Sequence, residues 1–372
     1  MIRFTDLLAN GLRNRGFSVE TVVPRRILVA KNGGPENAVW KWIGYVDKWI
    51  LFPIWLRRSV RTWRRKFGDG IRYHICDHSN APYLAHLPKH LTVVTCHDVL
   101  AIRGALGYPE AYCAASRTGV YLQRWILKHL SSANRIAAVS QLTLQHLCEI
   151  VGTKAPQPGW KVLHNAFNAE FKRIETGEAQ KILRQQGVSI SQPFLLHVGS
   201  NLPRKNRRML LLMTQQGDDS WPGHVCFAGE AADARLTDEA SELGILDRIH
   251  SVSKPDHQTL CALYSLAHAL IFPSFSEGFG WPLIEAQACG TPVIASNLAP
   301  LPEVSGGAAI HADPHNALSF GSALRTLNAP AIRESLIANG YKNIRRFSPT
   351  KMIDGYLALH DLNGDGMTRA TS

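Results

Sequence analysis

The sequence predicts an α/β protein built from two Rossmann-like domains that face each other across a central cleft. Three observations support this fold class. A chain of 372 residues is too long for one compact core. Short apolar runs rich in β-branched residues alternate with helical stretches, which is typical of doubly wound parallel sheets. The alternation is interrupted once, by a polar segment over residues 168–187, so we expect the two domains to join near residues 168–190.

The first half opens with a predicted helix, Ile2–Arg15, in which apolar residues recur at helical spacing, and then a short predicted strand, Phe17–Val23. Helices are also predicted at Tyr121–Leu130 and Gln141–Ile150. Four buried parallel strands are predicted in the segments RYHIC (72–76), LTVVTC (91–96), RIAAVS (135–140) and KVLHNA (161–166). A Rossmann-like domain normally begins with a strand and a glycine-rich turn. We therefore expect either that this strand lies upstream of Met1 or that the domain has lost it.

The second half repeats the alternation. Its predicted strands are PFLLHVG (193–199), HVCFAG (224–229), ALIFPS (269–274), TPVIAS (291–296) and AAIHA (308–312), with helices between them. The expected domains are therefore residues 1–175 and residues 176–345. Residues 346–372 are expected to form a helix and a tail in a position to cross back to the first domain.

Basic and aromatic residues are concentrated in residues 39–70. This segment holds eight Lys and Arg against two Asp, which is half of the net charge of +12, and five of the nine tryptophans. Tryptophan and Arg-rich helix faces favour an anionic membrane surface, whereas the run WILFPIWL is too short to cross a bilayer. Two interpretations remain open, peripheral binding to an anionic membrane and a core helix with a solvated basic flank. No recognition motif accompanies the charge, so we expect no nucleic-acid partner.

The seven cysteines are scattered and never paired at metal-ligand spacing, so they indicate free thiols in a reducing compartment. Met1–Glu20 is amphipathic rather than a secretory signal. The run CDHS (76–79) contains metal-binding residue types, but no second cluster accompanies it. We therefore expect a cytoplasmic protein without a metal site.

The strongest chemical signal is SFSEGFGWPLIEAQACGTPVIAS (274–296), a glycine turn between a strand and a helix. Gly278 and Gly280 allow a ligand to approach the backbone closely, and the free N–H groups at the helix start form an anion site suited to phosphate. Carboxylates would repel a diphosphate, so Glu277 and Glu285 should contact hydroxyl groups, of a sugar and a ribose respectively. The alternative is a buried glycine turn with a solvated pair of carboxylates.

This block resembles the signature of glycosyltransferase family 4, which consists of retaining enzymes of the GT-B fold. The resemblance implies that Glu277 lies beside the donor sugar and that Glu285 binds the ribose. It also implies that the amides of Gly278, Phe279 and Gly280 hold the sugar and the phosphate. The segments Gly290–Pro292 and Pro302–Val304 fit the same family pattern.

A second block, LLHVGSNLPRKNRRMLL (195–211), resembles the first strand and loop of the family's nucleotide-binding domain, with Gly199 and Ser200 at the strand end. Lys205 aligns with the family lysine that neutralises the donor diphosphate. Many members have Arg where this chain has Ser200, and Arg204 is the expected substitute because guanidinium binds phosphate bidentately. Arg207 and Arg208 are expected to be solvated. The alternative for the whole block is a surface basic loop.

In the first half, TVVTCHDVL (92–100) fits the family strand that ends in a histidine near the donor sugar, here His97. That position is the ligand-binding end of a parallel strand, although a lone histidine is more often structural. The segments Ala138–Leu147 and Val162–Phe171 also fit. The family's glycine-rich loop facing the acceptor has no counterpart in this sequence.

We therefore expect a retaining glycosyltransferase that uses no cofactor or metal. It would move a hexose from a UDP- or GDP-linked donor, held by residues 176–345, to a hydroxyl of a sugar or lipid-linked acceptor on the side of residues 1–175. His97, Lys205 and Glu277 are the expected catalytic residues, and the process is surface polysaccharide or lipopolysaccharide synthesis at the inner face of the cytoplasmic membrane. The alternatives are a donor-binding protein with little or no catalysis and a nucleotide-sugar epimerase on the same fold.

Overall fold

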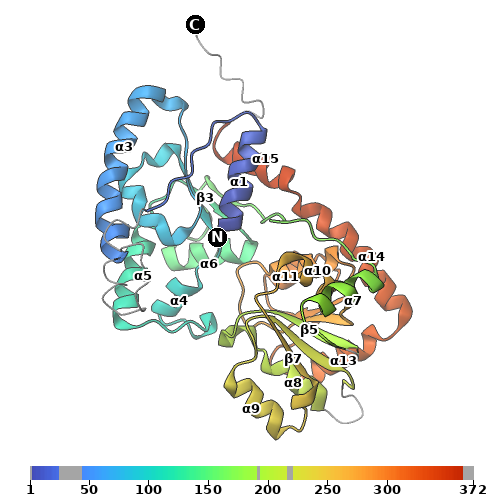
Figure 1. Ribbon diagram of the computed structural model, residues 1–372. Coiled ribbons are helices and arrows are strands. Elements are labelled where there is room, and N and C mark those ends of the chain that lie inside the picture. Colours follow the sequence, from blue (N-terminus) through green and yellow to red (C-terminus); the bar gives the residue numbers. More distant parts are fainter. Residues whose placement is uncertain (1, 25–43, 191–192, 216–220, 363–372) are drawn as a thin grey trace.

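A computed structural model describes residues 2–24, 44–190, 193–215 and 221–362 of the chain, which form two α/β domains (Figure 1). The first domain holds a parallel sheet in the order β1-β2-β3-β4, and the second a parallel sheet in the order β10-β9-β8-β5-β6-β7. Two parallel-sheet domains confirm the predicted fold class.

The strands of the first sheet are β1 (Tyr73–Ile75), β2 (Thr92–Cys96), β3 (Arg135–Ala138) and β4 (Trp160–Val162). Those of the second are β5 (Phe194–Gly199), β6 (His224–Gly229), β7 (Ile249–Ser253), β8 (Ala269–Phe272), β9 (Val293–Ser296) and β10 (Ile310–Ala312). All nine strands expected from residue 72 onward are present. The sequence analysis missed β7, a polar strand at the sheet edge.

The α-helices of the first domain are α1 (Ile2–Asn14), α3 (Phe52–Phe67), α4 (Leu100–Ala105), α5 (Arg117–Leu130) and α6 (Gln141–Val151). Those that follow are α7 (Thr176–Gln185), α8 (Arg208–Gln215), α9 (Ala234–Glu242), α10 (His257–Leu266), α11 (Trp281–Ala288), α12 (Leu301–Ser305), α13 (Ala317–Leu327), α14 (Pro330–Asn343) and α15 (Pro349–Leu359). Shorter helical turns include η1 (Asp47–Leu51), η3 (His78–His86), η6 (Pro203–Lys205) and η9 (Ile344–Phe347).

The expected strand over Phe17–Val23 is wrong. This segment is neither helix nor strand, and it is tied to α1 by bonds from Phe17 N to Leu12 O (3.2 Å) and from the Arg13 guanidinium to Val19 O (2.8 Å). Its residues alternate between half-buried and exposed, which is the pattern of a strand, but the sheet of the first domain does not pair with it.

Apolar residues on both faces of the second sheet explain its two helical layers. Along β5, Leu195 belongs to a buried cluster on one face and Leu196 to a buried cluster on the other, because successive strand residues point to opposite sides. Both are fully buried. The helices between the strands cover these two faces (Figure 1), which leaves the strand ends and their loops free to form a site.

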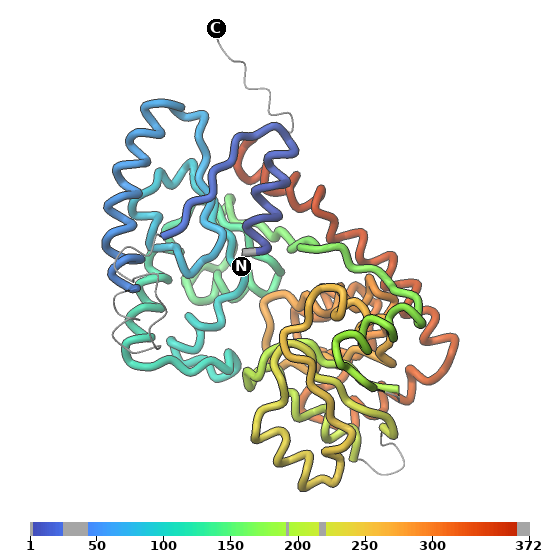
Figure 2. The backbone as a smooth tube through the Cα atoms, in the orientation of Figure 1, coloured from blue at the N-terminus to red at the C-terminus, as the bar shows by residue number. Residues whose placement is uncertain are grey.

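The chain passes between the domains twice, in the segment after β4 and in the helices α14 to α15 (Figure 2). Helix α15 packs against α1, and its Tyr356 hydroxyl lies 2.9 Å from Thr95 Oγ1 of β2. Arg72 Nε donates to His360 O at 2.9 Å. The last helix of the described chain therefore packs on the first domain.

Candidate functional site

The candidate site lies where the loops after β5 and β8 meet. These strands are parallel neighbours, so their carboxyl ends lie at the same edge of the sheet. The loop after β5 includes η6, with Arg204 and Lys205, and the loop after β8 is residues 274–280, called the glycine loop here. Phe275 N donates to Arg204 O at 2.8 Å, which joins the two loops directly.

Arg204, Lys205 and Glu277 form one buried ion cluster. Lys205 Nζ lies 2.6 Å from Glu277 Oε1, and Arg204 Nη1 lies 2.8 Å from Glu277 Oε2. Burial raises the pKa of the Glu277 carboxyl, but Lys205 and Arg204 together lower it more, so the net pKa is below the ordinary value. Glu277 is therefore ionised at neutral pH, and the cluster keeps an excess of positive charge.

The cluster is held by residues that the sequence analysis did not select. Asn206 has a left-handed backbone (φ 50°), and its Nδ2 donates to Pro273 O (3.2 Å) and Pro314 O (2.8 Å). Glu230 Oε2 accepts from Asn201 N at 2.7 Å. These contacts fix the loop after β5 against the ends of β6 and β8. They involve residues far apart in the chain, and no local sequence pattern reveals them.

The glycine loop presents unpaired amides. Gly280, at φ 101°, precedes α11, which has no side-chain cap. Within the described residues, the N–H groups of Gly278, Phe279 and Gly280 meet no acceptor. The Phe279 ring packs in a buried cluster with Val139, Ile284, Val304 and Phe347, so only its backbone is available. Free N–H groups at a helix start favour an anion.

Gly199 is the last residue of β5 and Ser200 follows it, beside Lys205 of the ion cluster. Gly199 O accepts from Glu230 N at 3.1 Å, and an added Cβ on Gly229 would lie 2.7 Å from that same oxygen. Gly199 itself has an extended backbone (φ 159°). Ser200 is half-buried, and its hydroxyl makes no hydrogen bond to the described part of the chain.

Glu285 lies on α11, apart from the ion cluster. Its Oε2 accepts a hydrogen bond of 2.8 Å from the hydroxyl of Tyr264 on α10, and burial raises the pKa of Glu285 to about 7. No hydrogen bond or ion pair between described residues joins Glu285 to Arg204, Lys205 or Glu277. Tyr264 is fully buried, and its pairing with Glu285 depends on how α10 packs on α11, which the sequence does not show.

His97, at the end of β2, reaches the glycine loop through its backbone. An added Cβ on Gly278 would lie 2.1 Å from His97 O. The imidazole is half-buried, with Nε2 3.0 Å from Cys76 O and its edge against Phe4 at 4.8 Å between ring centroids. Burial lowers the pKa of His97. A neutral ring that donates from Nε2 leaves Nδ1 as a free acceptor.

The expected solvation of Arg207 is wrong, whereas Arg208 is exposed as expected. Arg207 is 6% exposed, donates to Ala231 O and Glu230 O, and covers the Phe227 ring at 4.3 Å. It is therefore a structural residue under the loop after β6. Arg208 pairs with Glu239 at the surface.

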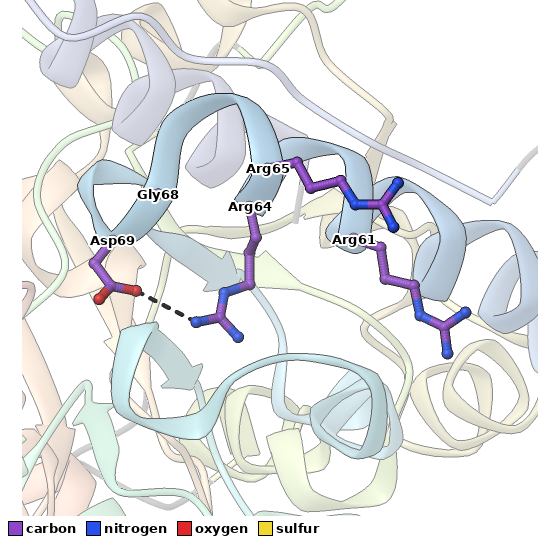
Figure 3. A pocket seen from close by; sticks show the side chains of 5 residues that line it. All are labelled: Arg61, Arg64, Arg65, Gly68 and Asp69. Atoms are coloured by element: carbon purple, nitrogen blue, oxygen red, sulfur yellow. Dashed lines mark hydrogen bonds and ion pairs between the residues drawn. The ribbon is translucent and has the colours of Figure 1, made fainter.

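The structure describes the basic segment over residues 39–70 from residue 44 onward. Trp40 and Trp42 lie outside the described residues, and Trp49 and Trp63 are partly buried against the first domain's core. Helix α3 buries Phe52, Pro53, Leu56 and Val60, half-buries Ser59 and Trp63, and exposes its other residues. Figure 3 shows a hollow beside its last turns, lined by Arg61, Arg64, Arg65, Gly68 and Asp69. Arg64 Nη2 lies 3.4 Å from Asp69 Oδ1, whereas the side chains of Arg61 and Arg65 point away from Asp69.

In the described ranges, no helix is long and apolar enough to cross a membrane. The same ranges contain no group of three or more His, Cys, Asp and Glu residues placed to hold a metal ion.

Comparison with known proteins matches both halves of the chain. The model "Glycosyltransferase Family 4" matches residues 2–171, and "Glycosyl transferases group 1" matches residues 179–343. O-antigen chain mannosyltransferase B of Escherichia coli is 28% identical over 295 residues, which cover 74% of this chain and 72% of that protein.

Two solved structures show the same fold. WaaG, a glycosyltransferase involved in lipopolysaccharide biosynthesis, superposes with a TM-score of 0.65 at 17% identity, over 97% of this chain and 95% of its own. Anabaena HepE in complex with UDP-glucose gives 0.63 at 18% identity, over 82% of each chain. These likenesses agree with the two matched family models, and the chain is a GT-B glycosyltransferase that belongs to family 4, group 1.

Proposed function

We propose that this glycosyltransferase moves a hexose from a nucleotide-diphosphate sugar to a hydroxyl group and retains the anomeric configuration. The observation that carries the proposal is the cluster of Arg204, Lys205 and Glu277 beside the free amides of the glycine loop. A diphosphate needs cations and N–H donors, and a sugar needs a carboxylate that accepts from its hydroxyls. The joined loops after β5 and β8 offer both kinds of group side by side.

The chemistry then depends on positioning and charge rather than on a covalent intermediate. The diphosphate gains negative charge as it leaves, so Arg204 and Lys205 stabilise the transition state more than the ground state. Protein cations supply this neutralisation, so the reaction needs neither metal nor cofactor. His97 presents a neutral imidazole on the opposite domain, suited to contact the donor sugar. Glu285 binds the ribose, and the glycine-loop amides hold the sugar and the phosphates.

The acceptor is a hydroxyl of a growing surface polysaccharide or lipopolysaccharide. O-antigen chain mannosyltransferase B supports this choice, and its name makes mannose the first sugar to test. HepE, crystallised with UDP-glucose, supports a nucleotide-linked donor. GDP-mannose and UDP-glucose are therefore the two donors to compare first.

Thermal unfolding with each donor, followed by release of labelled sugar, tests this function. A donor that binds the folded state raises the melting temperature, and the increase grows with the logarithm of its concentration relative to Kd. We expect stabilisation by one donor, slow hydrolysis without acceptor, and sugar release unaffected by EDTA. Stabilisation without release or transfer would instead establish a donor-binding protein. An isomerised nucleotide sugar as product would establish an epimerase.

We also propose that α3 holds the enzyme at the inner face of the cytoplasmic membrane. The exposed Ile50 of η1 lies just before this helix, and the helix's own outward face begins with the exposed Ile54 and Trp55 and continues with arginines. The exposed basic residues of the helix are Arg57, Arg58, Arg61, Arg64, Arg65 and Lys66. Apolar side chains at one end and cations along the face suit a helix lying on anionic lipid, where each basic residue contributes about 1 kcal/mol.

Liposome co-sedimentation distinguishes this membrane contact from a solvated helix face. Arg58, Arg61 and Arg65 carry no hydrogen bond or ion pair to other described side chains, so replacing all three by Ser should leave the fold intact. The control replaces the exposed Arg184, Arg235 and Arg345 of the second domain by Ser, which removes the same charge. We expect only the α3 variant to lose binding to anionic vesicles at low salt. Equal loss in both variants, or wild-type binding to neutral vesicles, would contradict the proposal.

A further inference from the structure

The first turn of α6, in the first domain, contacts the glycine loop of the second. Ser140 caps this helix, because its Oγ accepts from Thr143 N at 3.1 Å. The same hydroxyl donates to Gly278 O at 2.7 Å, and Thr143 Oγ1 donates to the same carbonyl at 3.2 Å. Ser140 is fully buried and Thr143 is 2% exposed. Two buried hydroxyls therefore converge on one carbonyl oxygen across the domain interface.

This contact sets the direction of an N–H group. A peptide unit is planar and trans, so its carbonyl and its N–H point in opposite directions. With Gly278 O directed at α6, the N–H of Phe279 points away from α6. That N–H has no acceptor among the described residues. The two hydroxyls thus orient an unpaired donor in the loop that follows Glu277.

The close approach depends on a glycine. An added Cβ on Gly278 would lie 2.1 Å from His97 O and 2.8 Å from Asp98 Cβ. Any other residue at position 278 would push the glycine loop away from the end of β2. The first domain therefore holds this peptide from two elements, β2 and α6.

A second contact fixes α6 to the second domain independently of the loop. Both carboxylate oxygens of Glu303, on α12, lie 3.0 Å from Gln141 N in the first turn of α6. His164 Nε2 lies 2.7 Å from Glu303 Oε1. A carboxylate at a helix N-terminus is favourable, because the helix dipole places partial positive charge there. Glu303 thus keeps the first turn of α6 in place over Gly278.

We propose that Ser140 and Thr143 are positioning residues that orient the Gly278–Phe279 peptide for the sugar of the donor. The first domain then completes the donor site only when α6 is docked on the glycine loop. This inference rests on the proposed function, since it assigns a donor contact to the N–H of Phe279. Nucleotide binding by the second domain does not depend on the orientation of this peptide. Nucleotide affinity and catalytic turnover can therefore be measured separately.

Four substitutions separate alignment from helix capping. Thr143→Val keeps the shape of the side chain and removes one hydroxyl from Gly278 O. Ser140→Asp keeps a good N-cap but offers no donor when ionised. Ser140→Thr keeps both the cap and the donor. The control, Thr153→Val, removes a hydroxyl 3.5 Å from Cys148 O just beyond the other end of the same helix.

Steady-state kinetics with GDP-mannose or UDP-glucose, and calorimetry with GDP or UDP, give the first readout. We expect Thr143→Val and Ser140→Asp to lower kcat at least tenfold while the nucleotide Kd changes less than threefold. Ser140→Thr and Thr153→Val should retain wild-type kcat. Wild-type kcat in Thr143→Val would overturn the proposal, as would an equal loss in Thr153→Val. Loss of nucleotide affinity in parallel with kcat would indicate a general structural role and would also overturn it.

Hydrogen–deuterium exchange gives a second readout that does not require activity. Peptides covering residues 274–280, in which the Phe275 N–H is bonded to Arg204 O, should exchange faster in Thr143→Val than in the wild type and in Thr153→Val. Unchanged exchange would refute the orienting contact even in an active enzyme. If the wild type neither binds nucleotide nor turns over, the proposed function fails, and the exchange result still decides whether α6 orders the loop.

Discussion

Lys205 Nζ lies 2.6 Å from Glu277 Oε1, and both side chains are about nine-tenths buried. Each residue is expected to contact a different part of the donor, the diphosphate and the sugar. In this structure they instead contact each other, and Arg204 completes the pair. The carboxylate thereby keeps two buried cations paired and in place. Donor binding would exchange this partner for a diphosphate and release Glu277 to the sugar hydroxyls.

Lys205→Ala should lower turnover far more than stability. Loss of one preorganised charge at a developing anion costs about 2.7–4 kcal/mol in the transition state, or roughly 10²–10³ in kcat. Glu277 keeps its ion pair with Arg204 in this variant, so the folded state loses only one of the two ion pairs of this carboxylate. Turnover at saturating donor and urea unfolding measure the two effects, and Arg208→Ala, which breaks the surface pair with Glu239, is the control. Wild-type turnover in Lys205→Ala would remove this residue from the mechanism.

Glu285 should make nucleotide binding depend on pH near neutrality. Burial raises the pKa of Glu285 to about 7, and only the ionised form accepts hydrogen bonds with both oxygens. Affinity for GDP or UDP should therefore increase as the pH rises from 6 to 8. The same shift has the opposite sign for stability. The raised pKa favours the protonated folded state, so this contribution is complete below the unfolded pKa near 4.5 and is lost as pH rises through 7.

Calorimetry across this range, repeated with Glu285→Gln, checks the prediction. The variant should bind the nucleotide more weakly by roughly 1–3 kcal/mol, the cost of a lost buried partner, and its affinity should no longer change with pH. Glu178→Gln, on the exposed surface of α7, is the control. A pH dependence that survives in Glu285→Gln would assign it to another group.

The strands and the glycine loop were predictable because their signals are local. Runs such as Thr92–Cys96 are β-branched up to the final cysteine and are buried throughout. The strand expected over Phe17–Val23 was wrong because its signal is not sufficient by itself. An alternating segment becomes a strand only if it pairs with the edge of a sheet. The strand Ile249–Ser253 was missed because an edge strand is only partly buried.

The site was predictable as a set of residue types and not as a set of contacts. The family resemblance selects Lys205 and Glu277, but nothing local indicates that they bind each other. Nor does it indicate that Tyr264 reaches Glu285 or that Ser140 reaches Gly278. Arg207 lies in the same basic run as Arg204 and Arg208, but it is buried over Phe227 and donates to Glu230 O and Ala231 O. Such contacts depend on tertiary packing of distant elements.

Replacing Tyr112 by glycine should lower the free energy of unfolding less than replacing it by alanine. Its ring stacks on Phe275 of the glycine loop, with centroids 4.8 Å apart and planes 14° apart, and its backbone is left-handed (φ 49°). Tyr112→Ala loses the stacking, about 0.5–1.5 kcal/mol, and keeps a conformation that costs a non-glycine residue roughly 1–2 kcal/mol. Tyr112→Gly loses the same contact and relieves that strain, although glycine's greater unfolded-chain entropy offsets part of the gain.

The free energy of unfolding in urea should therefore fall in the order wild type, Tyr112→Gly, Tyr112→Ala, with Tyr112→Phe close to the wild type because it keeps the ring. Alanine as stable as glycine would show that the left-handed backbone relaxes freely. A Tyr112→Phe variant as unstable as alanine would show that the hydroxyl, not the stack, matters.

His360 and His74 should make the protein sensitive to mild acid. His74 Nδ1 lies 3.0 Å from His360 Nε2, and His74 Nε2 lies 2.8 Å from Thr95 Oγ1. Burial, helped by Arg135 and Arg72 and opposed by Asp361, lowers the pKa of His360 to about 4. Burial, together with His360 and His97, lowers the pKa of His74 well below its ordinary value. Both rings are therefore neutral where α15 packs on the first domain.

A depressed pKa in a base means that the unfolded chain takes up the proton first. The stability that His360 contributes is thus complete above pH 6.5 and is lost as the pH falls toward 4, by about 3 kcal/mol at most at roughly 1.4 kcal/mol for each unit of pKa. Urea unfolding at pH 7.5 and pH 5 measures this loss, with the exposed His90→Gln as the control. His360→Gln should reduce the loss, because glutamine has no proton to gain. If His360→Gln loses as much stability between the two pH values as the wild type and His90→Gln, the acid sensitivity does not arise where His360 meets His74.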